Sequence, residues 1–135
     1  DSVSLETYAR LREALPGIAI VQVIHVRGEE SIDEAVNVSR HVDTLLLDSG
    51  NPTRAVKELG GTGRTHDWTI SRKIREIVDI PIYLAGGLHA GNVVQAIREV
   101  GPFGIDLCSG VRTNGSLDRR KLASFFESVR SAHNP

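Results

Sequence analysis

Helix and strand patterns alternate along the whole chain, and this alternation restricts the possible folds more than any other feature of the sequence. Dense runs of apolar and β-branched residues predict strands at 18–26, 43–48, 81–85 and 104–108. Apolar residues at helical spacing predict helices at 5–15, 31–41, 68–78 and 91–100 and from Asp118 onward, with Ser31 and Asp118 as N-caps. One helix followed by four strand–helix units is typical of an α/β fold with parallel strands and right-handed crossovers.

Two architectures fit this order: an open, doubly wound sheet, or part of a (β/α)8 TIM barrel. Each predicted strand ends in polar or Gly-rich residues, namely Arg27-Gly28, Asp48-Ser49-Gly50, Gly86-Gly87 and Ser109-Gly110. Barrels build their active sites from all the carboxyl ends of their strands, whereas an open sheet binds its ligand at one switch point. Several such strand ends therefore favour the barrel. No linker divides the chain, so we expect residues 1–135 to form a single domain.

A complete barrel takes roughly 200 residues or more, whereas this chain has 135 residues. We therefore expect the chain to be the C-terminal half of a barrel, with one helix and then four βα units. A half barrel leaves strand edges and one sheet face uncovered, and both favour association. We expect the chain to associate with a missing N-terminal half or to form a homo-oligomer. The absence of Met from the sequence adds to the expectation of a missing upstream segment.

Charge and composition disfavour several classes of protein. The net charge of -1 gives no general attraction to nucleic acid or to an anionic membrane. No apolar run approaches the ~20 residues that span a bilayer. The single Cys108 and the five histidines show no metal-ligand spacing, and only His66 and His89 are expected near the predicted site. We expect a cytoplasmic protein that binds a small molecule, without nucleic acid, membrane or metal.

The paired ends of the last two predicted strands indicate a phosphate site. Gly86 and Gly87 follow one strand, and Ser109 and Gly110 follow the next. Tandem glycines let the backbone approach a ligand closely, and N–H groups there and at a following helix N-terminus can bind phosphate. Barrels often build such a site after strands seven and eight. The alternative is that the glycines only make tight turns.

A second Gly-rich segment, KELGGTGRTHDW at 57–68, contains Gly60, Gly61 and Gly63. No Lys-Ser or Lys-Thr follows the glycines and no tight βα turn encloses them, so the segment resembles neither a Walker A loop nor a GxGxxG loop. The surrounding loop is unusually long for a compact domain, which favours a role in substrate binding. A flexible connection is the alternative.

Two carboxylates are candidates for chemistry. Asp48 ends an otherwise apolar strand, and a carboxylate at that end of a barrel strand is typical of a catalytic residue. Its alternative role is a turn residue or a helix cap. Asp106 lies between Ile105 and Leu107, so we expect it mid-strand and partly buried, either contacting substrate or making a structural hydrogen bond. Cys108 shares its face and is expected to be a small buried residue.

With these residues in place, the chain resembles the phosphoribosylanthranilate isomerase family. The resemblance covers most of residues 45–118, in the segments LLLDSG (45–50), KELGGTGRTHDW (57–68), PIYLAGGLHAGNV (81–93) and PFGIDLCSGVRTNGSLD (102–118). Their order and spacing match strands six, seven and eight of the family's barrel. By the same resemblance, residues 20–26 are strand five and the first helix is helix four.

The resemblance implies an enzyme of tryptophan biosynthesis that needs no cofactor. The family converts N-(5-phosphoribosyl)anthranilate, an aldose amine, into a 1-deoxyribulose 5-phosphate product by an Amadori rearrangement. The family's general acid is the Asp that ends strand six, which carries over to Asp48. Its base is a Cys at the end of strand one, which has no match in this sequence. The resemblance therefore implies that the isolated chain is inactive.

Two other functions stay open on the sequence. One is a related sugar-phosphate isomerase or epimerase on the same barrel. A Schiff-base aldolase is disfavoured because no Lys ends a predicted strand. The other is a non-catalytic phosphate-binding module, a half barrel in which Asp48 has no chemical role.

Overall fold

The computed structural model describes residues 3–50 and 68–133 and shows an α/β fold. Its main strands are β1 (Val21–His25), β2 (Thr44–Asp48), β3 (Ile82–Ala85) and β4 (Gly104–Ile105). Its helices are α1 (Leu5–Ala14), α2 (Glu30–Ser39), α3 (Thr69–Ile77), α4 (Val93–Val100) and α5 (Arg119–His133). A 3-10 turn, η1 (Ser109–Val111), and a short hairpin of β5 (Arg112–Thr113) and β6 (Ser116–Leu117) connect β4 to α5.

The four main strands form one parallel sheet in the order β1-β2-β3-β4. The parallel arrangement confirms the predicted α/β fold, and no switch point interrupts the sheet among the described residues. The register pairs His25 with Asp48, and Asp48 with Ala85. The carboxyl ends of β1, β2 and β3 therefore lie side by side at one edge.

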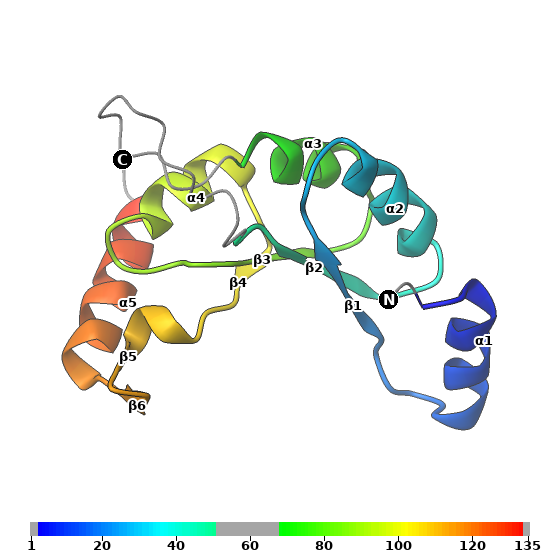
Figure 1. The fold of residues 1–135 in the computed structure, drawn as a ribbon, viewed down its shortest axis with the longest axis horizontal. Coiled ribbons are helices and arrows are strands. Elements are labelled where there is room, and N and C mark those ends of the chain that lie inside the picture. The colour runs from blue at the N-terminus through cyan, green and yellow to red at the C-terminus, as the bar shows by residue number, and fades with distance from the viewer. Residues whose placement is uncertain (1–2, 51–67, 134–135) are drawn as a thin grey trace.

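Helices cover one face of the sheet. Figure 1 shows α2, α3 and α4 in an arc on one side of the strands, with α1 and α5 near the two ends. The strand residues beneath this layer are at most 2% exposed: Ile24, Leu45, Leu47, Ile82 and Leu84. On the opposite face, Val21 is 54% exposed and Val23 is 40% exposed. The described residues thus form one helical layer on a sheet whose other face is largely bare.

Two predicted strands are shorter than expected. β1 starts at Val21 rather than at residue 18, because the Asp43 side chain accepts the Ile20 N–H at 2.7 Å before the ladder begins. β4 ends at Ile105 rather than at residue 108, because its partner β3 ends at Ala85. Strand length here depends on the neighbouring strand, which the local pattern does not reveal.

The two predicted helix caps differ in outcome. α2 begins at Glu30, so Ser31 lies inside the first turn rather than at the N-cap. Asp118 does cap α5, since its Oδ1 accepts the N–H groups of Arg120 and Lys121 at 2.9 and 3.1 Å. The Thr113 hydroxyl donates to Oδ2 of Asp118 and is the main cause that lowers the pKa of that carboxyl. The cap thereby joins α5 to the β5–β6 hairpin.

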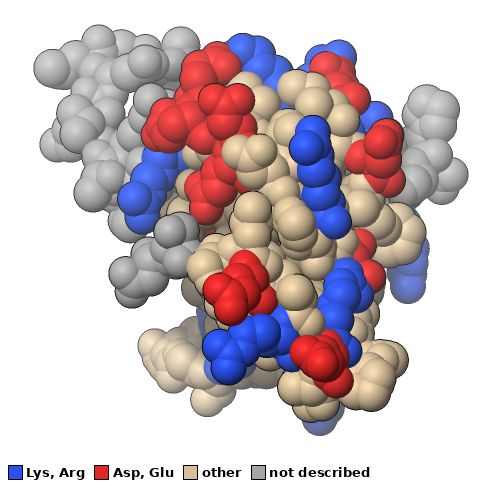
Figure 2. All heavy atoms as spheres, turned by 90° about the vertical axis from the view of Figure 1, so that its right-hand side faces the viewer, with Lys and Arg blue, Asp and Glu red and all other residues tan. Residues whose placement is uncertain are grey.

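The charged surface shown in Figure 2 is mixed. Lys and Arg side chains alternate with Asp and Glu over the visible face, which carries no continuous basic patch of the kind that binds nucleic acid. In the described ranges, no helix has the length and apolar character needed to cross a bilayer. Over the same ranges, no cluster of three or more His, Cys, Asp or Glu side chains could hold a metal ion.

Candidate active site

Asp48 lies at the carboxyl edge of the sheet, on the face that the helices leave bare. Leu47 is buried under the helices, and strand alternation turns the next residue to the opposite face. The Asp48 side chain is 31% exposed, and its Oδ1 accepts the Gly50 N–H at 3.1 Å. A carboxyl group held in this way can meet a ligand at the edge while one oxygen stays fixed by the backbone.

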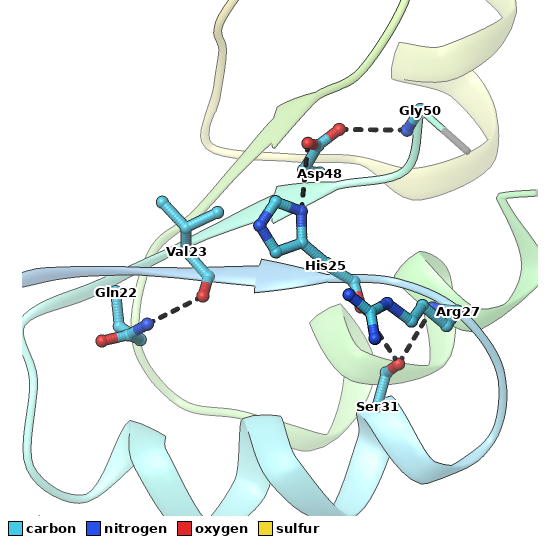
Figure 3. Close-up of polar contacts among 7 residues, drawn as sticks. All are labelled: Gln22, Val23, His25, Arg27, Ser31, Asp48 and Gly50. Carbon is cyan, nitrogen blue, oxygen red and sulfur yellow. Dashed lines mark hydrogen bonds and ion pairs between the residues drawn. The ribbon is translucent and has the colours of Figure 1, made fainter. Parts of the chain in front are cut away.

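His25 is the second member of the site, and the sequence analysis did not place it there. It ends β1 directly opposite Asp48 in the register. Its Nδ1 lies 3.2 Å from Oδ2 of Asp48, and its side chain is 62% exposed (Figure 3). Gly50 and His25 therefore contact different oxygens of the same carboxyl group.

The turn after β1 is held by a buried hydroxyl. Ser31 is 1% exposed, its Oγ accepts the Arg27 N–H at 3.0 Å, and it donates to the His25 carbonyl at 3.4 Å (Figure 3). The Val26 N–H donates to the Asp48 carbonyl at 2.9 Å. Backbone bonds on both sides of His25 thus fix where its side chain leaves the strand.

Gly86 provides the space beside Asp48. Its φ of 99° lies in a region that L side chains rarely adopt. A Cβ atom at this position would overlap the Gly50 nitrogen and lie 2.7 Å from Oδ1 of Asp48. Gly86, for which a phosphate contact was predicted, also packs closely against the end of the neighbouring strand.

The two Gly-bearing loops of the predicted phosphate site touch. A Cβ atom on Gly110 would overlap the carbonyl oxygen of Leu88, so the turn after β4 packs directly on the loop after β3. Gly87 in that loop is exposed with a φ of 62°. Asn92 holds the loop in shape, since its amide donates to the Gly87 carbonyl at 3.0 Å. The loops after β3 and β4 are therefore in direct contact.

An open pocket of about 540 Å³ lies next to these loops. Ser109 and Gly110 line it, together with Arg120 and Lys121 of α5. Its remaining lining comes from His89, Ala90, Gly91 and Ser124, whereas Gly86 and Gly87 are not part of it. Two cationic side chains beside the Ser109 turn make the local electrostatic environment favourable for an anion.

Asp106 and Cys108 differ from their expected burial. Both are exposed, because β4 has ended before them. The Asp106 N–H still donates to the Leu84 carbonyl at 2.9 Å, which keeps this segment beside β3. Asp106 was expected mid-strand and partly buried; it instead follows the strand, at the edge that carries Asp48.

The remaining predicted residues divide into two groups. Gly60, Gly61 and Gly63 lie outside the described residues. His89 lies in the loop after β3, as expected, and its Nδ1 accepts the Gly91 N–H at 3.1 Å. The expectation that only His66 and His89 lie near the site was wrong for His25. The signal was present in the sequence, because strand alternation that buries Ile24 turns His25 to the bare face.

The cluster of Asp48, His25 and Gly50 suits proton transfer. One oxygen of the carboxyl group accepts a backbone N–H, and the other faces an imidazole nitrogen. The Gly50 N–H donates to one oxygen of the carboxyl group, and such a donor stabilises a carboxylate as it forms. Reaction at this edge would also lie close to the loops that suit a phosphate.

The family model and the curated relatives point to one family. The family model described as N-(5'phosphoribosyl)anthranilate (PRA) isomerase matches residues 4–128. An N-(5'-phosphoribosyl)anthranilate isomerase from Nostoc punctiforme is 42% identical over 123 residues, which cover 90% of this chain and 56% of that protein. The chain spans about half the length of the curated relatives it matches.

Solved structures of this family also superpose on the chain. The phosphoribosyl anthranilate isomerase from Thermotoga maritima superposes with a TM-score of 0.75 at 28% identity, covering 96% of this chain and 58% of that one. The enzyme of the same name from Thermococcus kodakaraensis gives a TM-score of 0.73 at 33% identity, covering 95% of this chain and 59% of that one. Four parallel strands and their helices thus match a little over half of each structure.

Proposed function

Because this chain belongs to the N-(5'-phosphoribosyl)anthranilate isomerase family, we propose that it takes part in the isomerisation of N-(5'-phosphoribosyl)anthranilate in tryptophan biosynthesis. The observation that carries this proposal is the position of Asp48. It ends the second strand of the sheet, at the carboxyl edge, with its carboxyl group on the bare face. This is the edge at which barrel enzymes hold their catalytic residues.

In the proposed reaction, Asp48 is the general acid. Its carboxyl group gives a proton to the ribose ring oxygen, the bond from C1 to that oxygen breaks, and the anthranilate nitrogen supplies the electron pair that forms an iminium ion. A base then removes the C2 proton, and the resulting enolamine tautomerises to the ketone. The Gly50 N–H, which lies 3.1 Å from Oδ1, stabilises the carboxylate that Asp48 becomes.

The base of this reaction is a Cys on the family's first strand, and no residue of this chain corresponds to it. We propose that the four strands are strands five to eight of a (β/α)8 barrel, in a single domain over residues 1–135. The sequential strand order, the bare sheet face and the share of the solved structures that the chain covers support this assignment. The isolated chain would then be inactive until the other strands complete the barrel.

The substrate phosphate would bind where the loops after β3 and β4 meet. Backbone N–H groups of Gly86, Gly87, Ser109 and Gly110 are the proposed donors, as expected from the sequence. Support comes from the contact of Gly110 with Leu88 and from the cationic side chains of the adjacent pocket. Asp106 and the glycines Gly60, Gly61 and Gly63 are proposed as further substrate contacts. A cytoplasmic location is proposed from membership of the isomerase family, as is the biosynthetic role.

A complementation assay tests the function. The chain is assayed for loss of phosphoribosylanthranilate fluorescence, first alone and then co-expressed with strands one to four and helices one to three of the Nostoc punctiforme relative, because helix four is α1 of this chain. We expect almost no activity alone and measurable activity in the pair, which the Asp48→Asn change abolishes. Full activity of the chain alone would mean that it contains its own base, with Cys108 the first candidate. Inactivity of a properly assembled pair would refute the proposed function.

A further inference from the structure

The contact between His25 and Asp48 joins two neighbouring strand ends, and no part of the proposed reaction uses it so far. We propose that His25 is a positioning residue, whose Nδ1–H donates to Oδ2 of Asp48 and holds that carboxyl group ready to release a proton. This inference rests on the proposed function, because it assumes that Asp48 is the general acid.

The geometry assigns a separate partner to each carboxyl oxygen. Oδ1 accepts the Gly50 N–H at 3.1 Å, and Oδ2 lies 3.2 Å from Nδ1 of His25. A protonated Oδ2 can accept from His25 while its own O–H points outward to a ligand. Once the proton has left, donors remain on both oxygens and stabilise the carboxylate, and stabilisation of developing charge is what lowers a barrier.

The placement of His25 is built into the fold. The register sets it directly opposite Asp48, and the Val26 N–H fixes the backbone next to it by donating to the Asp48 carbonyl at 2.9 Å. Ser31 fixes the other side, since its buried hydroxyl bonds the His25 carbonyl and the Arg27 N–H. The imidazole therefore starts from a backbone position that is held before any ligand binds, which is the condition for preorganised stabilisation.

Exposure separates this role from a structural one. The His25 side chain is 62% exposed in this chain, so it contributes little to the core formed by the described residues. Its removal should therefore leave the fold of this chain intact and affect the carboxyl group. The matched variants are His25→Ala, His25→Asn and His25→Gln. Asn carries its amide nitrogen at the same number of bonds from the backbone as Nδ1, whereas Gln carries it at the distance of Nε2.

Kinetics in the complemented pair provide the first test. We expect His25→Ala to lower kcat by about 10- to 100-fold, the loss typical of one donor to a charged group, with KM within about 3-fold. His25→Asn should recover most of kcat, and His25→Gln should not. An unchanged kcat in His25→Ala, or equal losses in the Asn and Gln variants, would overturn the inference.

A measurement without substrate tests the contact between His25 and Asp48 independently of the proposed function. Imidazole ¹⁵N spectra should show His25 as the Nδ1–H tautomer, and Asp48→Ala should shift its ring nitrogens, whereas Asp79→Ala at the opposite edge should not. If Asp48→Ala leaves the ¹⁵N chemical shifts of His25 unchanged, the inference is overturned while the isomerase proposal stays intact. Conversely, an Asp48→Asn enzyme with unchanged kcat would refute the acid assignment, and with it the role of His25, even if the spectra confirm the contact.

Discussion

Gly86 and Asp48, on neighbouring strands, fit together only because residue 86 has no side chain: a Cβ atom there would lie 2.7 Å from Oδ1 of the carboxylate. Asp48 also pairs in register with Ala85, the residue before Gly86. The shape of the β3 end therefore sets the space in which the proposed acid works.

Replacing Gly86 with Ala should be far more damaging than the same change at Gly17. Both residues have positive φ, 99° and 86°, but a Cβ at Gly17 meets nothing within 4 Å. Gly17→Ala should cost about 1–2 kcal/mol, the strain of a left-handed L residue. Gly86→Ala should cost more than about 3 kcal/mol, because overlap with Gly50 and Asp48 adds to that strain. Urea unfolding of the two variants checks this, and equal losses would contradict it.

Asp48→Asn should lower kcat by about 10²–10⁴-fold, the usual contribution of general acid catalysis. Asn keeps the size of the side chain and can still hydrogen-bond the substrate, so KM should change little. The measurement is steady-state kinetics in the complemented pair. An unchanged kcat would contradict the acid assignment, whereas a rise in KM alone would indicate a role in substrate binding.

Gly110→Ala should weaken phosphate binding. The new methyl group would overlap the Leu88 carbonyl and push the two loops apart. Gly101→Ala is the control, because Gly101 precedes β4 at the opposite edge of the sheet and its methyl group would meet nothing closer than the Arg75 side chain at 3.8 Å. Titration with inorganic phosphate, followed by amide chemical shifts of Gly87 and Ser109, measures both affinities. Equal affinities in the two variants would contradict a phosphate site between the loops.

Asp118 should make the stability of α5 depend on pH. The Thr113 hydroxyl, followed by the Lys121 N–H, lowers the pKa of Asp118 in the folded state. Its contribution is therefore present above the unfolded pKa and is lost as pH falls through the folded pKa. Asp118→Asn keeps a capping oxygen but removes the charge, so the thermal midpoint of the variant should fall less steeply with acid. Parallel pH profiles for the variant and the unchanged chain would contradict this.

Val23→Asp should leave the isolated chain folded but prevent its association with the N-terminal units. Val23 is 40% exposed on the bare sheet face, so the charge should cost the isolated chain about 1 kcal/mol or less. In a completed barrel the same face is interior, so the variant should fail to complement the N-terminal units. Ile24→Asp, at a fully buried position, should prevent folding altogether. Complementation that survives Val23→Asp would contradict the half-barrel proposal.

Two features of the structure were predictable from local sequence but were not predicted: the β5–β6 hairpin and the place of His25 at the site. The Asn114-Gly115 dipeptide has positive φ at both residues, 53° and 79°, and turns the β5–β6 hairpin. That dipeptide is the strongest short-range hairpin signal. It was overlooked because each strand has only two residues, too few to show alternation. His25 was not predicted at the site because the predicted strand continued to residue 26, whereas β1 ends at His25.

The sequence by itself determined the order of strands and helices, their parallel arrangement, and the position of Asp48 at a strand end. These follow from side-chain periodicity and backbone preferences, which are local properties of the chain. The tertiary structure alone decided that β4 ends at Ile105, that Asp106 is exposed, and that His25 meets Asp48. Those features depend on the register and length of a neighbouring strand far away in sequence. Hydrogen bonding between strands sets this register and length, and the side-chain periodicity within one segment does not encode them.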